Sequence, residues 1–234
     1  MSKKTLIFTA VGDYDNKSWL SEDTNCDFII AYYGKSDEKY EQLKSISKYC
    51  FRSKGVKFQL LWSWWIHNRE ETKEYDIIGV LDDDLQWNSK TMNEFLSMIK
   101  THLNNRDKSA AVYSPTHDSN GKVTREHMRQ QLENTNILRK VNGIEMTWPF
   151  FERKFLDSYL MNDYEISLVG FGEGRLYSYK ALKEKRNLYV SDKFSSINPT
   201  DNQKNRKNNE MSGTYPYYEK IWQIIQKERK INLP

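Results

Sequence analysis

Short apolar runs alternate with longer amphipathic stretches along this chain. Runs rich in β-branched and aromatic residues predict buried strands, and apolar residues at helical spacing predict helices. The predicted strands are Thr5–Val11, Asp27–Tyr33, Asp76–Leu81 and Ala110–Ser114. The predicted helices are Ser36–Phe51, Leu60–Thr72, Ser89–Leu103, Glu152–Met161 and Arg175–Lys185. This alternation predicts an α/β fold in which helices cover a mostly parallel, Rossmann-like central sheet.

The same pattern predicts one domain followed by a C-terminal extension. Residues 1–198 are expected to form a single α/β domain, in which the polar stretch Thr116–Asn142 is a flexible insertion over the site. Residues 199–214 are dense in Asn, Lys, Asp and Gln, which predicts a polar linker or mobile loop. Residues 215–234 carry apolar side chains at helical spacing, which predicts a helix that packs back on the domain.

Charge and composition exclude several classes of protein. The formal net charge is +4, and no basic run is dense enough for a nucleic-acid-binding arm, although a mild positive field suits a diphosphate-bearing substrate. Two cysteines, Cys26 and Cys50, do not imply a disulfide framework. No apolar run reaches the roughly 18 residues of a membrane span, and the N-terminus does not resemble a signal peptide. We therefore expect a cytoplasmic protein, and its Lys- and Asn-rich composition suits a bacterial, protist or viral origin.

Three consecutive carboxylates, Asp82, Asp83 and Asp84, follow one of the predicted strands. Ligands in open α/β sheets bind at the carboxyl ends of strands. Adjacent like charges repel one another unless a cation compensates, and carboxylate oxygens suit Mg²⁺ or Mn²⁺. Side-chain alternation predicts that Asp82 and Asp84 face one side and Asp83 the other. The triplet therefore predicts a metal site, with a solvated surface turn as the alternative.

An apolar strand followed by Asp-x-Asp and a further apolar residue resembles the signature of GT-A nucleotide-sugar glycosyltransferases. The Trp-rich segment Lys57–His67, then Tyr75–Ile78 and Leu81–Leu85, is similar to an uncharacterised family of plant and microbial glycosyltransferases. The resemblance spans about residues 5–198. It includes three further segments, Ala111–Pro115, Gly143–Phe151 and Val169–Gly174.

The resemblance implies a nucleoside-diphosphate sugar donor, a UDP- or GDP-sugar, and a carbohydrate or glycoprotein acceptor. Asp84, together with Asp82, would bind the Mn²⁺ or Mg²⁺ that bridges the diphosphate, and Asp82 would also lie near the ribose or base. The family often places a metal-binding histidine after the position of Asp192, whereas Lys193–Asn198 contains none. Either an oxygen ligand or water takes that place, or the metal is held less tightly.

Candidate contacts to the nucleotide sugar come from several segments. Gly12 follows the first strand, where a glycine permits close approach of the backbone. Lys57 opens the Trp-rich helix, which the resemblance places near the nucleotide, although an exposed lysine is the alternative. For Asp83 the alternative is a structural role that fixes a neighbouring backbone or lysine. The full predicted set is Gly12, Asp13, Lys57, Gln59, Asp82, Asp83, Glu145 and Trp148, of which the last two are expected in a strand.

Glu173 is the predicted catalytic base, because an inverting transferase needs a base within reach of the acceptor hydroxyl. It lies between Gly172 and Gly174. The alternative is a glycine-capped helix start in which Glu173 stabilises the helix dipole. The histidines show no paired metal spacing and are expected at the surface; His117, next to Asp118, is the one of most interest.

Three other functions stay open on the sequence alone. An aspartate-dependent phosphotransferase also has Asp-x-Asp at a strand end, but usually follows it with Thr or Val rather than Leu85. A sugar nucleotidyltransferase needs a glycine-rich phosphate loop near the first strand, for which Gly12 alone is too sparse. The third is a GT-A-like carbohydrate- or nucleotide-binding protein with little or no turnover.

Overall fold

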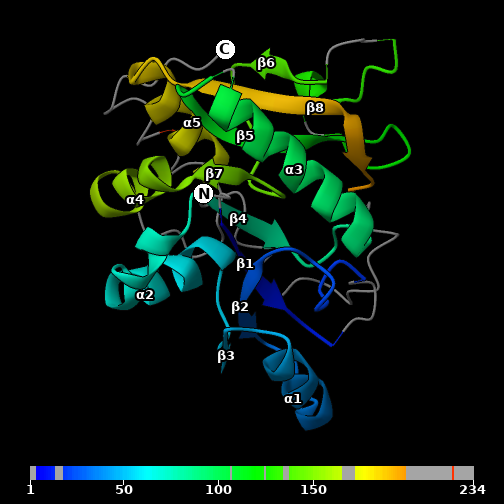
Figure 1. Ribbon diagram of the computed structural model, residues 1–234, viewed down its shortest axis with the longest axis vertical. Helices are drawn as coiled ribbons and strands as arrows, with labels where there is room; N and C mark the ends of the chain where they lie inside the picture. The colour runs from blue at the N-terminus through cyan, green and yellow to red at the C-terminus, as the bar shows by residue number, and fades with distance from the viewer. Residues whose placement is uncertain are drawn as a thin grey trace.

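The computed structural model describes residues 4–13, 18–105, 107–123, 125–133, 137–164, 172–198 and 223. Within these ranges, one sheet of eight strands is flanked by helices on both faces (Figure 1). The strands are β1 (Thr5–Val11), β2 (Asp27–Tyr32), β3 (Tyr49–Arg52), β4 (Ile77–Asp82), β5 (Ala110–His117), β6 (Arg139–Val141), β7 (Phe150–Glu152) and β8 (Asn187–Ser196). The helices are α1 (Asp37–Ser45), α2 (Lys57–Asn68), α3 (Ser89–Asn105), α4 (Arg153–Asn162) and α5 (Glu173–Lys183), with short 3-10 turns η1 (Glu71–Glu74) and η2 (Glu126–Met128).

The strand directions bring most strand ends to one edge of the sheet. The strand order is β3-β2-β1-β4-β7-β5-β8-β6. Strands β3, β2, β1 and β4 are parallel, and β7 runs antiparallel between β4 and β5. Because β5 therefore points the same way as β4, and β8 is parallel to β5, the ends of β1, β2, β3, β4, β5 and β8 share one edge. We call it the carboxyl edge. The predicted α/β fold with a mostly parallel sheet is confirmed.

Strands β1, β2 and β4 are buried on both faces, which explains why they are nearly continuous apolar runs. Along β1, Phe8 packs into a cluster with apolar residues of α2, α4 and α5, whereas Ile7 packs into a second cluster with apolar residues of α3. In Figure 1, α2, α4 and α5 accordingly lie on the opposite side of the sheet from α3. The central strands are thus held from both sides, so their ends are rigid supports for a site.

One predicted helix, Ser36–Phe51, is wrong in its second half. Helix α1 ends at Ser45, and the chain then forms β3, which pairs with β2 in parallel. Residues Tyr49–Phe51 contain two aromatic side chains, which favour a strand where a neighbouring edge is open to pairing. The predicted helix Leu60–Thr72 begins earlier, at Lys57, and ends at Asn68.

Further differences concern caps and short strands. Asn88 caps α3, since its Oδ1 accepts a hydrogen bond from Thr91 N at 2.9 Å. The stretch Thr116–Asn142, expected as an insertion, contains η2 and β6. Glu145 and Trp148 lie before β7 rather than within a strand.

The predicted linker 199–214 lies outside the described residues, as does the predicted terminal helix 215–234 apart from residue 223. No helix in the described part of the chain is long and apolar enough to cross a membrane.

Candidate functional site at the carboxyl edge

The acidic triplet lies at the carboxyl edge, where Asp82 ends β4 and Asp83 and Asp84 form the following turn. The backbone N–H of Asp82 donates to Thr147 O at 2.8 Å, which joins the end of β4 to the segment that leads into β7. Asp84 is half-buried. The three acids therefore leave the strand at the position where ligands of open α/β sheets bind.

Asp83 holds neighbouring strand ends together. Its buried carboxylate accepts hydrogen bonds through Oδ2 from Gly12 N at 3.0 Å and from Tyr33 OH at 3.1 Å. Gly12 follows β1 and Tyr33 follows β2, so one side chain joins the ends of three strands. A Cβ on Gly12 would lie 2.6 Å from Cε2 of Tyr33, so a larger residue here would have to displace the Tyr33 ring. The structural role considered for Asp83 matches this geometry.

Lys57 places a cation against the triplet. It begins α2, and its side chain is only 4% exposed. The ammonium lies 2.9 Å from Asp82 Oδ1, and it also donates to the carbonyl oxygens of Met146 and Thr147 at 2.5 and 2.9 Å. Burial lowers the pKa of Lys57, while the charges of Asp82, Asp84 and Asp83 act in the opposite direction. The exposed-lysine alternative is therefore wrong.

The donor set of the triplet fits a hard divalent cation. Asp82 and Asp84 supply carboxylate oxygens, and Mg²⁺-like ions are commonly held by one or two carboxylates together with substrate phosphates and water. Among the residues that the structure describes, no group of three His, Cys, Asp or Glu side chains could hold a metal ion. Asp192, next to the position of the family's histidine, is bound to Arg139, whose Nε lies 3.0 Å from its Oδ2. A metal here would need ligands from its substrate.

Asp13 stabilises the loop that leads into α1. Its Oδ2 accepts from Lys35 N at 2.9 Å, and its Oδ1 accepts from Ser36 N at 3.4 Å and from the hydroxyl of Tyr32. Asp13 is exposed and follows Gly12, so it borders the same edge as the triplet. Gln59 is half-buried on α2, two residues after Lys57.

A second group of polar side chains surrounds Glu145. Its side chain is 12% exposed; its Oε2 lies 4.0 Å from His117 Nδ1, and its Oε1 lies 3.9 Å from Arg125 Nε. Burial raises the pKa of Glu145 to about 7, although the charges of Arg125 and Lys122 act to lower it. The edge therefore contains a carboxyl group whose charge changes near neutral pH.

His117 is fully buried at the end of β5, so its predicted surface position is wrong. Its Nε2 lies 3.3 Å from Thr147 Oγ1, and its ring packs edge-on against Trp148 with the ring centroids 5.2 Å apart. Burial lowers the pKa of His117 to about 4. Trp148 is also fully buried, so its ring packs beneath the surface of the site and is not exposed for stacking against a sugar. The strand was predicted to end at Ser114, whereas β5 continues to His117 and thereby buries it.

Glu173 is the first residue of α5, after Gly172, which has a φ of 92°. Its side chain is fully buried and accepts a hydrogen bond from Tyr159 OH at 2.5 Å. The helix also supports the Glu145 segment, since Tyr177 OH donates to Glu145 O at 2.7 Å. A Cβ on Gly174 would lie 2.7 Å from Ile144 O, so α5 packs directly on that segment. This geometry matches the glycine-capped helix start considered as the alternative.

We expect Glu173→Ala to lower the free energy of unfolding by about 2–4 kcal/mol, because it leaves a cavity and removes the acceptor of the buried Tyr159 hydroxyl. Glu173→Gln keeps an acceptor oxygen and is expected to cost less. Urea unfolding measures both, with Lys183→Ala on the exposed part of α5 as the control. Wild-type stability of Glu173→Ala would contradict this structural role.

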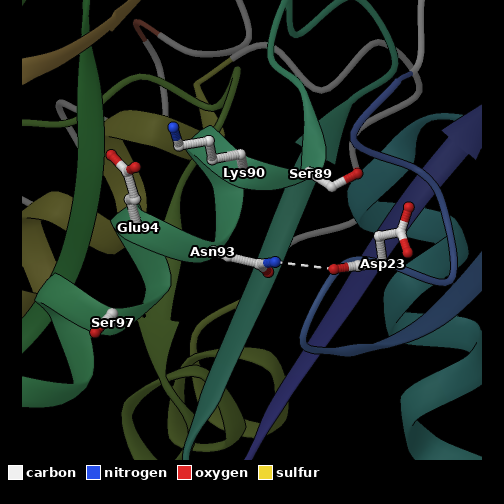
Figure 2. A pocket seen from close by; sticks show the side chains of 6 residues that line it. All are labelled: Asp23, Ser89, Lys90, Asn93, Glu94 and Ser97. Atoms are coloured by element: carbon white, nitrogen blue, oxygen red, sulfur yellow. Dashed lines mark hydrogen bonds between the residues drawn. The ribbon is translucent and has the colours of Figure 1, made fainter.

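Two hollows in the described surface lie away from the acidic triplet. One, beside α3, is shallow and is lined by Asp23, Ser89, Lys90, Asn93, Glu94 and Ser97 (Figure 2). In it, Asn93 donates through Nδ2 to the carbonyl oxygen of Asp23 at 2.8 Å, which holds the loop before β2 against the helix. A second is lined by residues at the end of α4 and along α5, among them Asp163, which follows α4, and Lys180. Neither includes a residue of the acidic triplet, so neither marks the candidate site.

Comparison with known proteins identifies the fold. No family model matches the chain, and no curated protein matches it. The crystal structure of GalNAc-T7 with UDP, GalNAc and Mn²⁺ is similar with a TM-score of 0.61 at 10% identity, covering 95% of this chain and 48% of that one. S. aureus TarS 1–349 has a TM-score of 0.52 at 12% identity, covering 83% and 60%. A mycobacterial protein has a TM-score of 0.55 at 11% identity, covering 88% and 68%.

The chain thus has an α/β fold of the GT-A type, which it shares with GalNAc-T7 and TarS. It spans about half the length of GalNAc-T7. At these identities the likeness concerns the fold, and the chemistry has to be argued from the residues of this chain.

Proposed function

We propose that this protein is a metal-dependent glycosyltransferase that moves a sugar from a UDP- or GDP-sugar to a hydroxyl group of a carbohydrate or glycoprotein acceptor. The observation that carries the proposal is the position of Asp82, Asp83 and Asp84 at the carboxyl edge of a GT-A-type sheet. The fold supports it, because GalNAc-T7 has the same fold and was crystallised with UDP, GalNAc and Mn²⁺.

In this proposal Asp84 and Asp82 would hold Mn²⁺ or Mg²⁺, and the ion would supply Lewis-acid stabilisation of the departing diphosphate. Lys57 fixes the orientation of Asp82 and holds it against the segment before β7. Asp83 fixes the backbone of Gly12, which would otherwise be free to move away from the nucleotide.

The remaining residues of the predicted set border the donor in different ways. Asp13 is exposed and the backbone at Gly12 is free of a side chain, so both are proposed to contact the nucleoside. Gln59 is proposed to contact the donor from α2. Trp148 is buried and is proposed to shape the floor of the site.

A GT-A-like binding protein with little turnover is the second candidate. Its support is specific: Asp192 is bound to Arg139, and the described residues contain no three-ligand metal group. Such a protein would bind the nucleotide sugar at the same edge but would not transfer the sugar. Measurements of binding and of turnover separate the two candidates.

The proposal is tested by titrating Mn²⁺ with and without UDP or GDP while following tryptophan fluorescence. Trp87 follows the triplet by three residues, and the Nε1 of Trp19 donates to Leu85 O at 3.0 Å, so both are placed to report binding. We expect Mn²⁺ and nucleotide each to tighten the binding of the other, because each would complete the other's ligand set. Binding of Mn²⁺ that is indifferent to both nucleotides would contradict the proposal. Slow hydrolysis across a panel of UDP- and GDP-sugars then separates the enzyme from the binding protein.

A further inference from the structure

A hollow of about 510 Å³ lies between the end of α4 and one side of α5, and we call it the α4–α5 hollow. This volume is within the range of small-molecule sites, roughly 300–1,000 Å³. The two helices lie on the same side of the sheet (Figure 1). Asn162 and Asp163 form the α4 wall. The α5 wall consists of residues at helical spacing, which therefore share one side of the helix: Leu176, Tyr179, Lys180, Lys183 and Glu184.

Lys180 is the buried centre of the polar lining. Its side chain is 10% exposed, and its ammonium lies 2.7 Å from Asp163 Oδ2 and 2.6 Å from Glu184 Oε1. Burial acts to lower the pKa of Lys180, but its hydrogen bonds to the two carboxylates raise the pKa above its ordinary value, so the ammonium stays charged. The carboxylates remain 37% and 39% exposed. Lys180 therefore holds two accessible acceptor groups in place, and little entropy would be lost in ordering them around a ligand.

The backbone on both sides of the hollow is fixed as well. Asp163 N donates to Tyr159 O at 2.9 Å, which closes the last turn of α4 on a fully buried residue. Glu184 N donates to Lys180 O at 3.0 Å at the end of α5. The hydroxyl of Tyr159 also binds Glu173 at the start of α5, so the two helices are joined beneath the hollow. The α4–α5 hollow is thus a preformed feature of the fold.

The charges of this hollow favour a neutral ligand over an ion. Asp163 and Glu184 supply two negative charges. Lys180 and Lys183 supply two positive charges, so the formal charges of the lining cancel. An anion would lie against the two carboxylates, and a divalent cation would lie against the ammonium between them, and like charges brought together are unfavourable. A sugar hydroxyl both donates and accepts, so it can bind the carboxylates, the lysines and the Asn162 amide without adding charge.

Tyr179 adds an aromatic side chain beside these polar groups. It is half-buried on α5 and packs against the apolar core. Leu176, one turn earlier on the same side of the helix, is buried. An aromatic ring that is partly open to solvent offers an apolar surface with little side-chain entropy to lose. A sugar has an apolar C–H face and a rim of hydroxyl groups, and it matches a ring bordered by carboxylates.

We propose that the α4–α5 hollow binds a neutral carbohydrate, with Asp163 and Glu184 accepting hydrogen bonds from its hydroxyl groups and Tyr179 packing against its C–H face. The lining contains no residue of the acidic triplet, so binding needs neither metal nor nucleotide. The inference therefore goes beyond the proposed transferase and does not depend on it. Where both hold, the hollow gives the protein a second contact with a glycan acceptor.

The test is a saturation-transfer NMR titration of the full chain, without metal or nucleotide, using neutral trisaccharides of glucose, galactose, mannose and N-acetylglucosamine. We expect at least one of them to bind with a millimolar or lower Kd. Asp163→Asn and Glu184→Gln keep the side-chain size but remove the charge. Each should weaken this binding by about tenfold, because hydrogen bonds to charged groups are stronger than those to neutral groups. Tyr179→Leu should weaken it by a similar factor, since it removes the ring.

Glu94→Gln is the matched control, because Glu94 is an exposed helical acid in the other hollow, beside α3 (Figure 2). It should leave the Kd within about twofold of the wild type, as surface substitutions usually do. Glu184 is exposed at the end of its helix, so Glu184→Gln reports on binding even if Asp163→Asn disturbs the fold. Urea unfolding of each variant checks this point.

Two kinds of result would overturn the carbohydrate site. One is the absence of binding by all four trisaccharides, or binding that Glu184→Gln and Tyr179→Leu leave unchanged. The other comes from calorimetric titrations with inorganic phosphate and with MgCl₂: an ion that binds more tightly than the sugars and is weakened by Glu184→Gln assigns the hollow to that ion. Either result leaves the proposed transferase untouched, because its own test is the coupling between Mn²⁺ and nucleotide.

Discussion

Replacing Asp84 by alanine is expected to weaken the Mn²⁺-dependent binding of UDP by about 100-fold or more. Asp84 is one of the two carboxylates proposed to hold the cation, and a hard divalent ion with few protein ligands loses most of its affinity with one of them. Isothermal titration of UDP at fixed Mn²⁺ measures the change. Without Mn²⁺, the variant should bind UDP as weakly as the wild type does.

Although Asp84→Ala is expected to weaken UDP binding, it should not lower the stability of the metal-free protein. Three adjacent carboxylates repel one another when no divalent ion is bound, so removing one should leave the metal-free fold at least as stable as the wild type. Asp23→Ala, in an exposed loop beside α3, is the control and should change neither quantity. Unchanged UDP affinity in Asp84→Ala would exclude this carboxylate from the site, and the enzymatic proposal would then lose its main support.

The second large effect is expected for Lys57→Met, which should lower the free energy of unfolding by about 3 kcal/mol. The substitution keeps an unbranched side chain only one atom shorter, but it leaves the Asp82 carboxylate without its cation and two carbonyl oxygens without their donor. Breaking a buried pair by removing one partner costs about 3–5 kcal/mol, and the 34% exposure of Asp82 places this pair at the lower end. Urea unfolding gives the value directly.

A double-mutant cycle shows whether the loss comes from the pair. In the Asp82→Asn background, Lys57→Met should cost less than it does in the wild type, because the unpaired charge is already gone. Lys54→Met, an exposed lysine three residues earlier, is the matched control and should change stability by less than about 0.5 kcal/mol. Equal costs in the two backgrounds would show that Lys57 acts through the carbonyl oxygens alone.

The central strands were predictable because their short, continuous apolar runs favour a buried strand over any other element. Thr5–Val11 is apolar on both faces, and the structure buries it on both faces, so its limits match the prediction. The triplet was placed correctly at a strand end because charge begins where the apolar run stops. The segment Tyr49–Phe51 was not predictable locally. It follows a helical stretch without a break in pattern, and it becomes a strand because β2 offers it an open edge.

The candidate site was only partly predictable, since it is built from contacts between distant segments. Lys57 was predicted to contact the nucleotide, with an exposed lysine as the alternative, but no local pattern showed that its ammonium would be buried against Asp82 and two carbonyl oxygens. The glycines beside Glu173 suggested a presented carboxylate. Tyr159, on a different helix, instead encloses it. The grouping of His117 with Glu145 depends on where β5 ends beside the segment before β7, which no local pattern encodes.

The contact between Lys57 and the triplet has a consequence for which ions this edge can hold. Three carboxylates and one ammonium leave a formal charge of −2, which a single divalent cation cancels and a sodium or potassium ion cancels only by half. The lysine thereby sets the charge balance of the site. In the proposed metal site this balance would favour a doubly charged ion over a monovalent one.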